Sequence, residues 1–218
     1  MHFSILFASA WLAICSTIVS AFPDVPFTTS GRWIRDSNGK NFTYVGVNWP
    51  GAADTMLPEG LQYQSISFIV SKIKSLNLNV IRLTFAIEMI DDILDKGGDV
   101  PILTAFTKAL GSSNGQKVFN AVVKNNPQFS ASTTRLQVSH NANINLIRNS
   151  DSSMQVFDAV AAECAKQGIY VHLDNHMSQA AWCCSTTDGN SWFGDKYFDV
   201  TKWKRGLEYI AKHVSFPR

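Results

Sequence analysis

Polar side chains that could bind a sugar or carry a proton cluster at the end of one apolar segment. Asp174, Asn175 and His176 directly follow residues 169–173, a largely apolar run. Such a run predicts a parallel strand that is covered on both faces. Functional groups of parallel sheets gather at the carboxyl ends of the strands, so we expect a site here. His176 could donate to a substrate hydroxyl or hold a carboxylate in place, while Asp174 could instead accept backbone N–H groups of nearby loops.

A second charged group lies inside an apolar segment. Arg82 lies within residues 79–85, an otherwise largely apolar run that is typical of a strand. Burying an unpaired guanidinium is so costly that we expect a carboxylate partner nearby. Such a pair either holds a catalytic carboxylate ionised or is a structural salt bridge. Because both residues lie on predicted parallel strands, we expect Arg82 and His176 to converge at one end of the sheet.

Aromatic and amide side chains accompany these groups. Trp49, Trp182 and Trp192 lie just beyond predicted strand ends, and Asn48 and Asn175 are close to them in sequence. Sugars present apolar C–H faces that stack on indole rings, and amides bind their hydroxyls. A single tryptophan would more simply belong to the core, but three in such positions favour a saccharide cleft.

The remaining patterns predict the elements that must position these residues. A hairpin is expected around Asn38-Gly39, and its second arm continues through residues 44–49. Apolar residues recur at helical spacing in 62–76, and further helices are expected at 101–110, 116–123, 156–166 and from Thr201 onward. Strand and helix patterns alternate, which predicts an α/β fold with a parallel sheet and helices outside it.

The composition fits one secreted globular domain. The chain has 218 residues, 45% of them hydrophobic, and its net charge of +2 argues against a nucleic acid partner. Residues 1–21 contain no charged side chain and end in Val-Ser-Ala, a small-x-Ala cleavage pattern. We therefore expect a signal peptide at 1–21 and no stable membrane anchor. An uncleaved anchor is the alternative.

The cysteines indicate a secreted protein rather than a metal site. Without residues 1–21 the chain keeps Cys164, Cys183 and Cys184, an odd number in a compartment where thiols usually pair. We expect at least one free thiol or an absent partner. Adjacent cysteines lack the spacing of zinc ligands, so Cys183-Cys184 more simply staples the loop beside Trp182, and no metal is expected.

Four segments together resemble a known enzyme family. Residues 46–66, 69–94, 156–200 and 203–213 are similar to secreted fungal cellulase-like enzymes of glycoside hydrolase family 5. The resemblance implies a (β/α)8 barrel that hydrolyses a β-linked glucan or related glycoside with retention, as a monomer and without a cofactor. It also implies that Arg82 supports the nucleophile and that His176 lines the cleft.

The chain departs from this family in its catalytic residues. The family places an acid/base Glu after the fourth barrel strand and a nucleophilic Glu after the seventh, and we find neither motif here. We therefore expect residues 22–218 to form part of the catalytic domain, with about three barrel strands and an N-terminal β-hairpin, and to be inactive alone. The alternatives are a non-catalytic carbohydrate-binding or cell-wall protein, or a purely structural secreted domain.

One segment has no counterpart in the resemblance. Residues 138–155 are rich in Asn and Ser and separate Gln137 from the helical pattern at Val156. The segment begins with Val-Ser, whose codons can match a splice donor. It ends with Gln, whose codon can match a splice acceptor. Val-Ser recurs at Val214, where the resemblance stops. We expect two introns read as protein. The alternative is a genuine surface-loop insertion with an authentic C-terminus.

Overall fold

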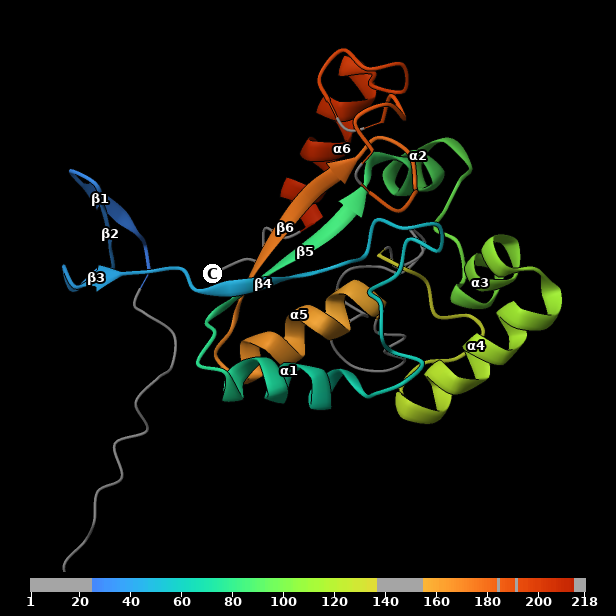
Figure 1. Cartoon of the computed structure of the whole chain (residues 1–218), viewed down its shortest axis with the longest axis horizontal. Helices are drawn as coiled ribbons and strands as arrows, with labels where there is room; N and C mark the ends of the chain where they lie inside the picture. The colour runs from blue at the N-terminus through green and yellow to red at the C-terminus, as the bar shows by residue number, and fades with distance from the viewer. Residues whose placement is uncertain (1–24, 137–154, 184, 191, 214–218) are drawn as a thin grey trace, which may run out of the picture.

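The computed structural model describes residues 25–136, 155–183, 185–190 and 192–213, and these form two small sheets and six helices (Figure 1). The expected signal peptide at 1–21 lies outside the described residues, as do Cys184 and most of the 138–155 segment. In the part of the chain that is described, no helix has the length and apolarity that crossing a membrane requires.

The N-terminal sheet is antiparallel and contains the predicted hairpin. Its strands are β1 (Thr28–Ser30), β2 (Trp33–Arg35) and β3 (Asn41–Phe42), in the order β1-β2-β3. The turn between β2 and β3 has Gly39 at φ 75°, and Asp36 Oδ1 accepts from the Lys40 N–H at 2.9 Å. Rings of this sheet pack on Tyr170, with the Phe27 and Phe42 centroids each 5.6 Å from it. The hairpin therefore closes the amino-terminal end of the second sheet.

The second sheet is parallel, as the sequence predicts. It consists of β4 (Gly46–Trp49), β5 (Val80–Ala86) and β6 (Tyr170–Met177) in the order β4-β5-β6. Among the described residues β4 and β6 each pair only with β5, so the sheet is open. The α/β class with a parallel sheet is confirmed, whereas closure into a barrel stays a prediction.

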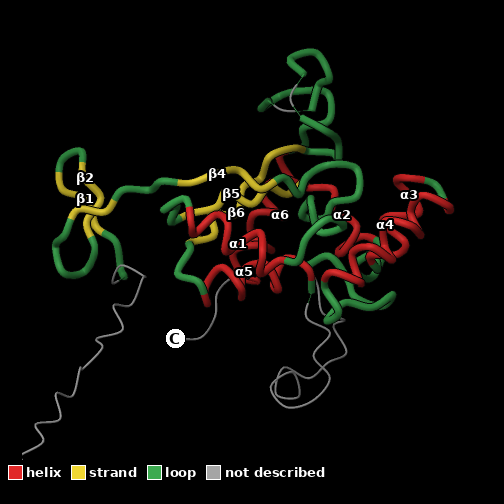
Figure 2. Tube along the Cα trace, turned by 60° about the horizontal axis from the view of Figure 1, so that its bottom comes forward, coloured by secondary structure: helices red, strands yellow, loops and turns green. Residues whose placement is uncertain are grey.

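Six helices surround the sheet. Figure 2 shows α1 and α5 together beneath the strands. The helices α3 and α4 form a hairpin beside the loop that follows β4, and α2 packs on α6. Their bounds are α1 Ile66–Ser75, α2 Ile87–Asp95, α3 Ile102–Leu110, α4 Ser112–Asn125, α5 Val156–Lys166 and α6 Val200–His213.

Helix α1 shows why the apolar stripe forms a helix. Ser65 caps it by accepting from the Phe68 N–H at 3.1 Å, and Ile66, Val70 and Ile73 are buried. The stripe ends there, because Leu76 follows the last turn and is 68% exposed. Thr201 does not cap α6 as expected: the helix begins one residue earlier.

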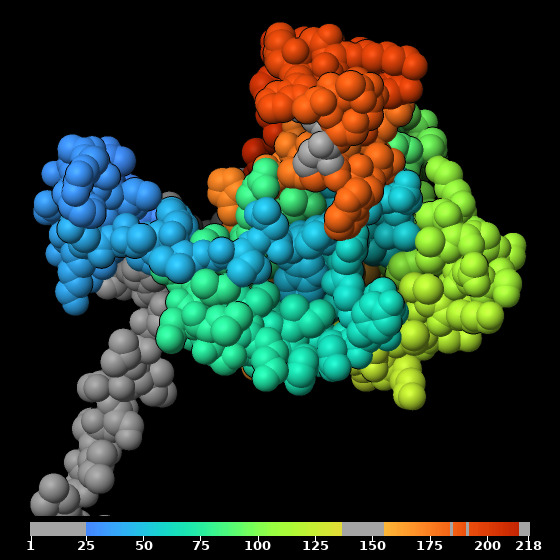
Figure 3. All heavy atoms as spheres, in the orientation of Figure 1, coloured from blue at the N-terminus to red at the C-terminus, as the bar shows by residue number. Residues whose placement is uncertain are grey.

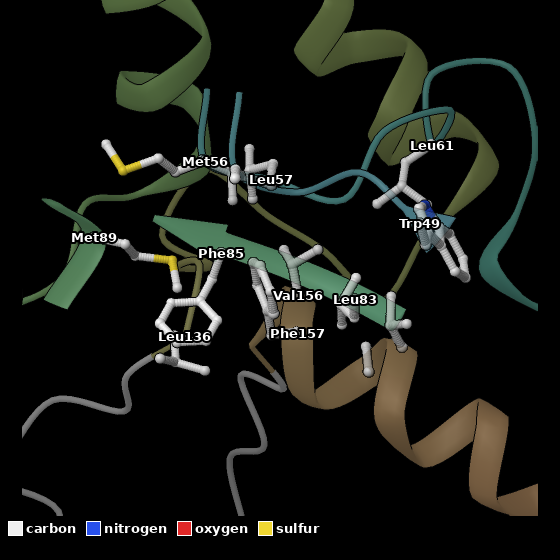
Figure 4. Close-up of a cluster of buried hydrophobic side chains, with 14 of the residues drawn as sticks. Trp49, Met56, Leu57, Leu61, Leu83, Phe85, Met89, Leu136, Val156 and Phe157 are labelled. Atoms are coloured by element: carbon white, nitrogen blue, oxygen red, sulfur yellow. The ribbon is translucent and has the colours of Figure 1, made fainter. Parts of the chain in front are cut away.

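The core lies between the sheet and its helices. Leu83 and Phe85 of β5 face Val156 and Phe157 of α5 (Figure 4), and each of these four side chains is at most 2% exposed. Alternation along β5 sends Arg82 to the opposite face. One sheet face is thus packed on helices, and the other carries polar groups.

Candidate functional site

The polar face of the parallel sheet brings together groups from all three strands. Asn48 of β4, Arg82 of β5 and His172 of β6 are register partners, so their side chains share this face. Arg82 Nη1 donates to Asn48 Oδ1 at 3.3 Å, and Arg82 Nη2 lies 2.9 Å from Asp174 Oδ2. The carboxylate partner expected for Arg82 is therefore Asp174.

His176 completes this group. Its Nδ1 lies 2.8 Å from Asp174 Oδ2 and 3.2 Å from Arg82 Nη2. Its Nε2 lies 3.0 Å from the sulfur of Cys183, which is disulfide-bonded. The predicted convergence of Arg82 and His176 is confirmed. We call Asn48, Arg82, Asp174 and His176 the polar cluster.

The burial expected for Arg82 is wrong. Its side chain is 41% exposed, against 17% for Asp174, because the sheet face on which it lies is open in the described chain. An ion pair with one exposed partner contributes little to stability. The polar cluster is consequently better suited to binding than to holding the fold together.

The loops around the polar cluster are held by hydrogen bonds. The buried Thr84 Oγ1 accepts from the N–H groups of Gly51 at 2.9 Å and Ala52 at 3.2 Å. Gly51 permits this contact, since a Cβ there would lie 2.5 Å from the carbonyl oxygen of Thr84. The Ala181 N–H in turn donates to Ala52 O at 3.2 Å. The segment that carries Trp182 is thereby fastened to the loop after β4.

A small hollow of about 170 Å³ opens beside the polar cluster. Asn48, Thr84, His176, Trp182 and Cys183 contribute to its lining. The Trp182 side chain is 68% exposed, so one face of its indole ring is free for a ligand. We call this hollow the polar cleft.

Three of the predicted binding residues lie outside the polar cleft, and a fourth, Asp174, belongs to the polar cluster without lining the cleft. Trp49 is 4% exposed, and its Nε1–H donates to Glu59 O at 2.9 Å, which makes it a core residue. Asn175 pairs with the buried Phe85 and faces away from its neighbours Asp174 and His176, because side chains alternate along a strand. Its Oδ1 is buried without a hydrogen-bond partner among the described residues. Trp192 is 62% exposed and does not line the polar cleft.

The four glutamates that fit no catalytic motif have other contacts. Glu88 accepts from the Ala180 N–H at 2.9 Å, and Glu208 pairs with Lys212 on α6. Glu163 lies on α5 beside Lys166. Burial and the charge of Asp54 raise the pKa of Glu59, which lies in the loop after β4.

The remaining titratable groups give no sign of a metal centre. Within the described ranges, no three His, Cys, Asp or Glu side chains are grouped so that they could hold a metal ion. Cys164 is free and buried on α5, and desolvation raises the pKa of its thiol to about 12. The free thiol that the odd cysteine count predicts is therefore Cys164, which is kept protonated at neutral pH.

Comparison with known proteins relates the chain to carbohydrate-active enzymes. No family model matches it. The chain is 31% identical over 197 residues to a protein from Chamaecyparis obtusa described as a glycosyl hydrolase 5 family protein, covering 88% of this chain and 30% of that relative. The chain thus spans about a third of the relative's length.

One solved structure supports the α/β fold. The catalytic domain of the major endoglucanase from Xanthomonas campestris pv. campestris aligns with a TM-score of 0.51 at 19% identity, over 85% of this chain and 40% of that one. A hyperthermophilic endocellulase from Pyrococcus horikoshii aligns with a TM-score of 0.49 at 20% identity, over 87% of this chain and 40% of the other.

Proposed function

Because this chain is related in sequence to the glycosyl hydrolase 5 family over most of its length, we propose that it forms the sugar-binding part of a retaining β-glycosidase acting on β-linked glucan. One observation supports this most directly. The polar cluster brings together side chains of all three parallel strands, directly beside the exposed Trp182. Hydrogen-bonding groups next to an exposed indole are the combination that a pyranose ring requires.

Each residue of the polar cluster has a proposed role. Asn48 lines the polar cleft and binds sugar hydroxyls, and Trp182 stacks on a C–H face of the ring. His176 also lines the cleft, with its ring held by Asp174 and Cys183. Arg82, held between Asn48 and Asp174, supplies the positive charge that keeps a nucleophilic carboxylate ionised. These groups position the sugar and support the nucleophile.

Hydrolysis itself is proposed for the whole enzyme. Retaining chemistry uses two carboxyl groups about 5 Å apart, one as nucleophile and one as acid/base. We matched neither family glutamate to this sequence, and Glu88, Glu163 and Glu208 lie on helices. We therefore expect this chain to bind β-glucan oligosaccharides without cleaving them.

Titration with cellotetraose tests the proposal. Tryptophan fluorescence should change on binding, and Trp182→Ala should weaken affinity by about fivefold, since stacking on an aromatic ring contributes roughly 1 kcal/mol. Trp33→Ala is the matched control, because Trp33 lies on β2 and is 43% exposed. Equal affinities for both variants would contradict the proposal. Specific release of glucose or cellobiose by this chain would overturn our assignment of the catalytic residues.

Secretion is part of the same proposal. The uncharged residues 1–21 and their Val-Ser-Ala end support cleavage before Phe22. N-terminal sequencing of protein from culture supernatant should begin at Phe22. Recovery of chains that still begin at Met1 would argue for a retained anchor instead.

A further inference from the structure

A second hollow lies next to the polar cleft. The helices α3 and α4 pack beside the loop after β4, and between them is a space of about 280 Å³. Leu57, Leu61 and Phe106 line its floor, while Leu110 of α3 and Val118 of α4 contribute side walls. We call this space the helical hollow. Its volume is close to the lower end of the range usual for small-molecule sites.

The two hollows are adjacent and share part of their lining. Trp182 and Ala53 line both the helical hollow and the polar cleft. The hydrogen bond between Ala181 N and Ala52 O holds this shared wall in place. Figure 3 shows the orange segment that carries Trp182 lying against the cyan loop after β4. A ligand whose sugar ring occupies the polar cleft could therefore extend past the indole into the helical hollow.

The lining of the helical hollow differs from that of the polar cleft. Aliphatic and aromatic side chains supply most of its lining: Leu57, Leu61 and Phe106 are 3–8% exposed, and Leu110 is 40% exposed. Such surface favours apolar groups, because contact removes apolar surface from water. Asp54 and Glu59 also line the space, and neither has an ion-pair partner among the described residues. Their negative charges disfavour an anionic ligand.

From this adjacency and from the chemistry of the lining we propose that the helical hollow binds an uncharged apolar group attached to the sugar in the polar cleft. The ligand class is a β-glycoside with an alkyl or aryl aglycone. This inference rests on the proposed function, since it requires the polar cleft to hold the sugar. The polar cleft recognises the glycosyl unit, and the helical hollow determines which aglycones are accepted.

Isothermal titration of the monomeric chain, isolated by gel filtration, tests this with two matched ligands. Octyl β-D-glucoside, used below its micellar concentration, should bind at least about tenfold more tightly than methyl β-D-glucoside, because only its chain reaches apolar surface. Leu110→Asn should remove most of this difference and leave methyl glucoside affinity unchanged. Leu76→Asn is the control, since Leu76 is 68% exposed after α1 and does not line the helical hollow.

A charged ligand tests the selectivity for uncharged groups. The octyl glucoside analogue with a terminal carboxylate should bind at least about tenfold more weakly than octyl glucoside itself. The double variant Asp54→Asn, Glu59→Gln should recover much of that loss, while leaving octyl glucoside affinity within about twofold.

The outcomes separate the two proposals. Equal affinity for octyl and methyl glucoside overturns the inference but leaves the proposed function standing. If Leu110→Asn weakens cellotetraose as much as octyl glucoside, the helical hollow is a further sugar site and the apolar aglycone is wrong. Failure of cellotetraose and both glucosides to bind would reject the proposed function together with the inference.

Discussion

At the scale of residues, the desolvation cost of Arg82 predicts its ion-pair partner correctly but its exposure incorrectly. The expense of burying a guanidinium correctly predicts a carboxylate partner, which is Asp174. The same argument predicts a buried side chain, whereas Arg82 is 41% exposed on the open face of the sheet. Pairing depends on neighbouring strands, but burial depends on what covers the face, and local sequence contains no information on that.

Replacing Arg82 by lysine separates binding from stability. The guanidinium contacts Asn48 through Nη1 and Asp174 through Nη2, and a single ammonium group cannot reproduce both contacts. We expect Arg82→Lys to lower cellotetraose affinity by about tenfold. The free energy of unfolding should change by less than about 1 kcal/mol, since the pair is half-exposed.

The control for this variant is Arg205→Lys, which makes the same change in a guanidinium that bridges Asp91 and Asp95 away from the polar cleft. Calorimetric titration and thermal unfolding of both variants provide the comparison. A loss of affinity in Arg205→Lys as large as that in Arg82→Lys would assign the effect to general charge rather than to the polar cluster.

At the scale of elements, alternation along strands accounts for the correct and the incorrect site predictions. Asp174 and His176 are two residues apart on β6 and reach the polar cluster, while Asn175 between them faces the other side. Asn48 and Trp49 are likewise adjacent on β4 and point to opposite faces, which places Trp49 in the core. Consecutive residues of a regular strand point to opposite faces, so this part of the site was predictable from the strand assignments, whereas the register shift of β6 at His176 was not.

Five of the six described helices were predicted from their apolar patterns, whereas α2 was missed, and the contacts that join distant elements were not predictable. Arg135 is 1% exposed and contacts two carboxylates from another segment, with Nη2 3.2 Å from Asp92 Oδ2 and Nε 2.7 Å from Asp99 Oδ1. These residues are more than thirty positions apart in sequence. No local pattern marks Arg135 as buried, since its partners depend on how α2 and the segment before α5 pack together.

Removing Arg135 should destabilise the fold strongly. Arg135→Met removes the guanidinium that Asp92 and Asp99 share while both carboxylates stay buried, so we expect a loss of about 3–5 kcal/mol in the free energy of unfolding. Arg205→Met removes a guanidinium that is 34% exposed and should cost at most about 1 kcal/mol. Urea unfolding of both variants measures the difference. Similar losses of unfolding free energy in the two variants would mean that the buried ion pairs of Arg135 do not stabilise the fold more than the exposed pairs of Arg205.

The same network predicts a dependence of stability on pH. Burial alone would raise the pKa of Asp92, but its contacts with Lys96 and Arg135 outweigh burial and hold the pKa below its ordinary value of 3.8. A carboxyl group with a lowered pKa in the folded state stabilises the fold above its unfolded pKa and loses this effect as pH falls through the folded value. Stability should therefore decrease below about pH 4, and this decrease should be smaller in Arg135→Met.

At the scale of the whole molecule, the open parallel sheet is the feature with the largest consequence. In the described chain β4 lacks a partner on one side, and Val45 and Val47 beside its free edge are 46% and 37% exposed. Unpaired strand edges with apolar side chains template association between chains. We expect the isolated protein to self-associate as its concentration rises.

A charged residue at the edge should reduce this association. Val47→Lys places a cation beside the free edge of β4, where strand addition would bury it. Light scattering should show association at clearly higher concentration than for the unchanged chain. Leu76→Lys introduces the same charge at an exposed residue far from the edge and should have little effect. Equal suppression by both variants would indicate that net charge, rather than the edge, controls association.

Hydrogen bonds connect the residues on the two sides of the segment 138–155 directly to each other. Residues 138–154 lie outside the described ranges, but Gln155 is 2% exposed, and its Oε1 accepts from the Thr134 N–H at 2.8 Å. The N–H groups of Val156 and Phe157 donate to the carbonyl groups of Thr134 at 3.2 Å and Arg135 at 3.0 Å. The first N–H groups of a helix ordinarily have no partner within that helix.

Removing 138–155 would place Val156 and Phe157 four residues after Thr134 and Arg135, which is the spacing of α-helical hydrogen bonds. Gln137 would then occupy the place of Gln155 with an identical side chain. We expect the deletion variant to retain α5 and to unfold with a free energy within about 1 kcal/mol of the intact chain, or higher, because a closed loop costs entropy. A deletion of 133–150 is the control. It has the same length but removes Arg135, which is 1% exposed and pairs with Asp92 and Asp99, and should cost about 3–5 kcal/mol. A strongly destabilised 138–155 deletion would show that the segment is an integral part of the fold, and mature transcripts that retain its codons would defeat the intron interpretation.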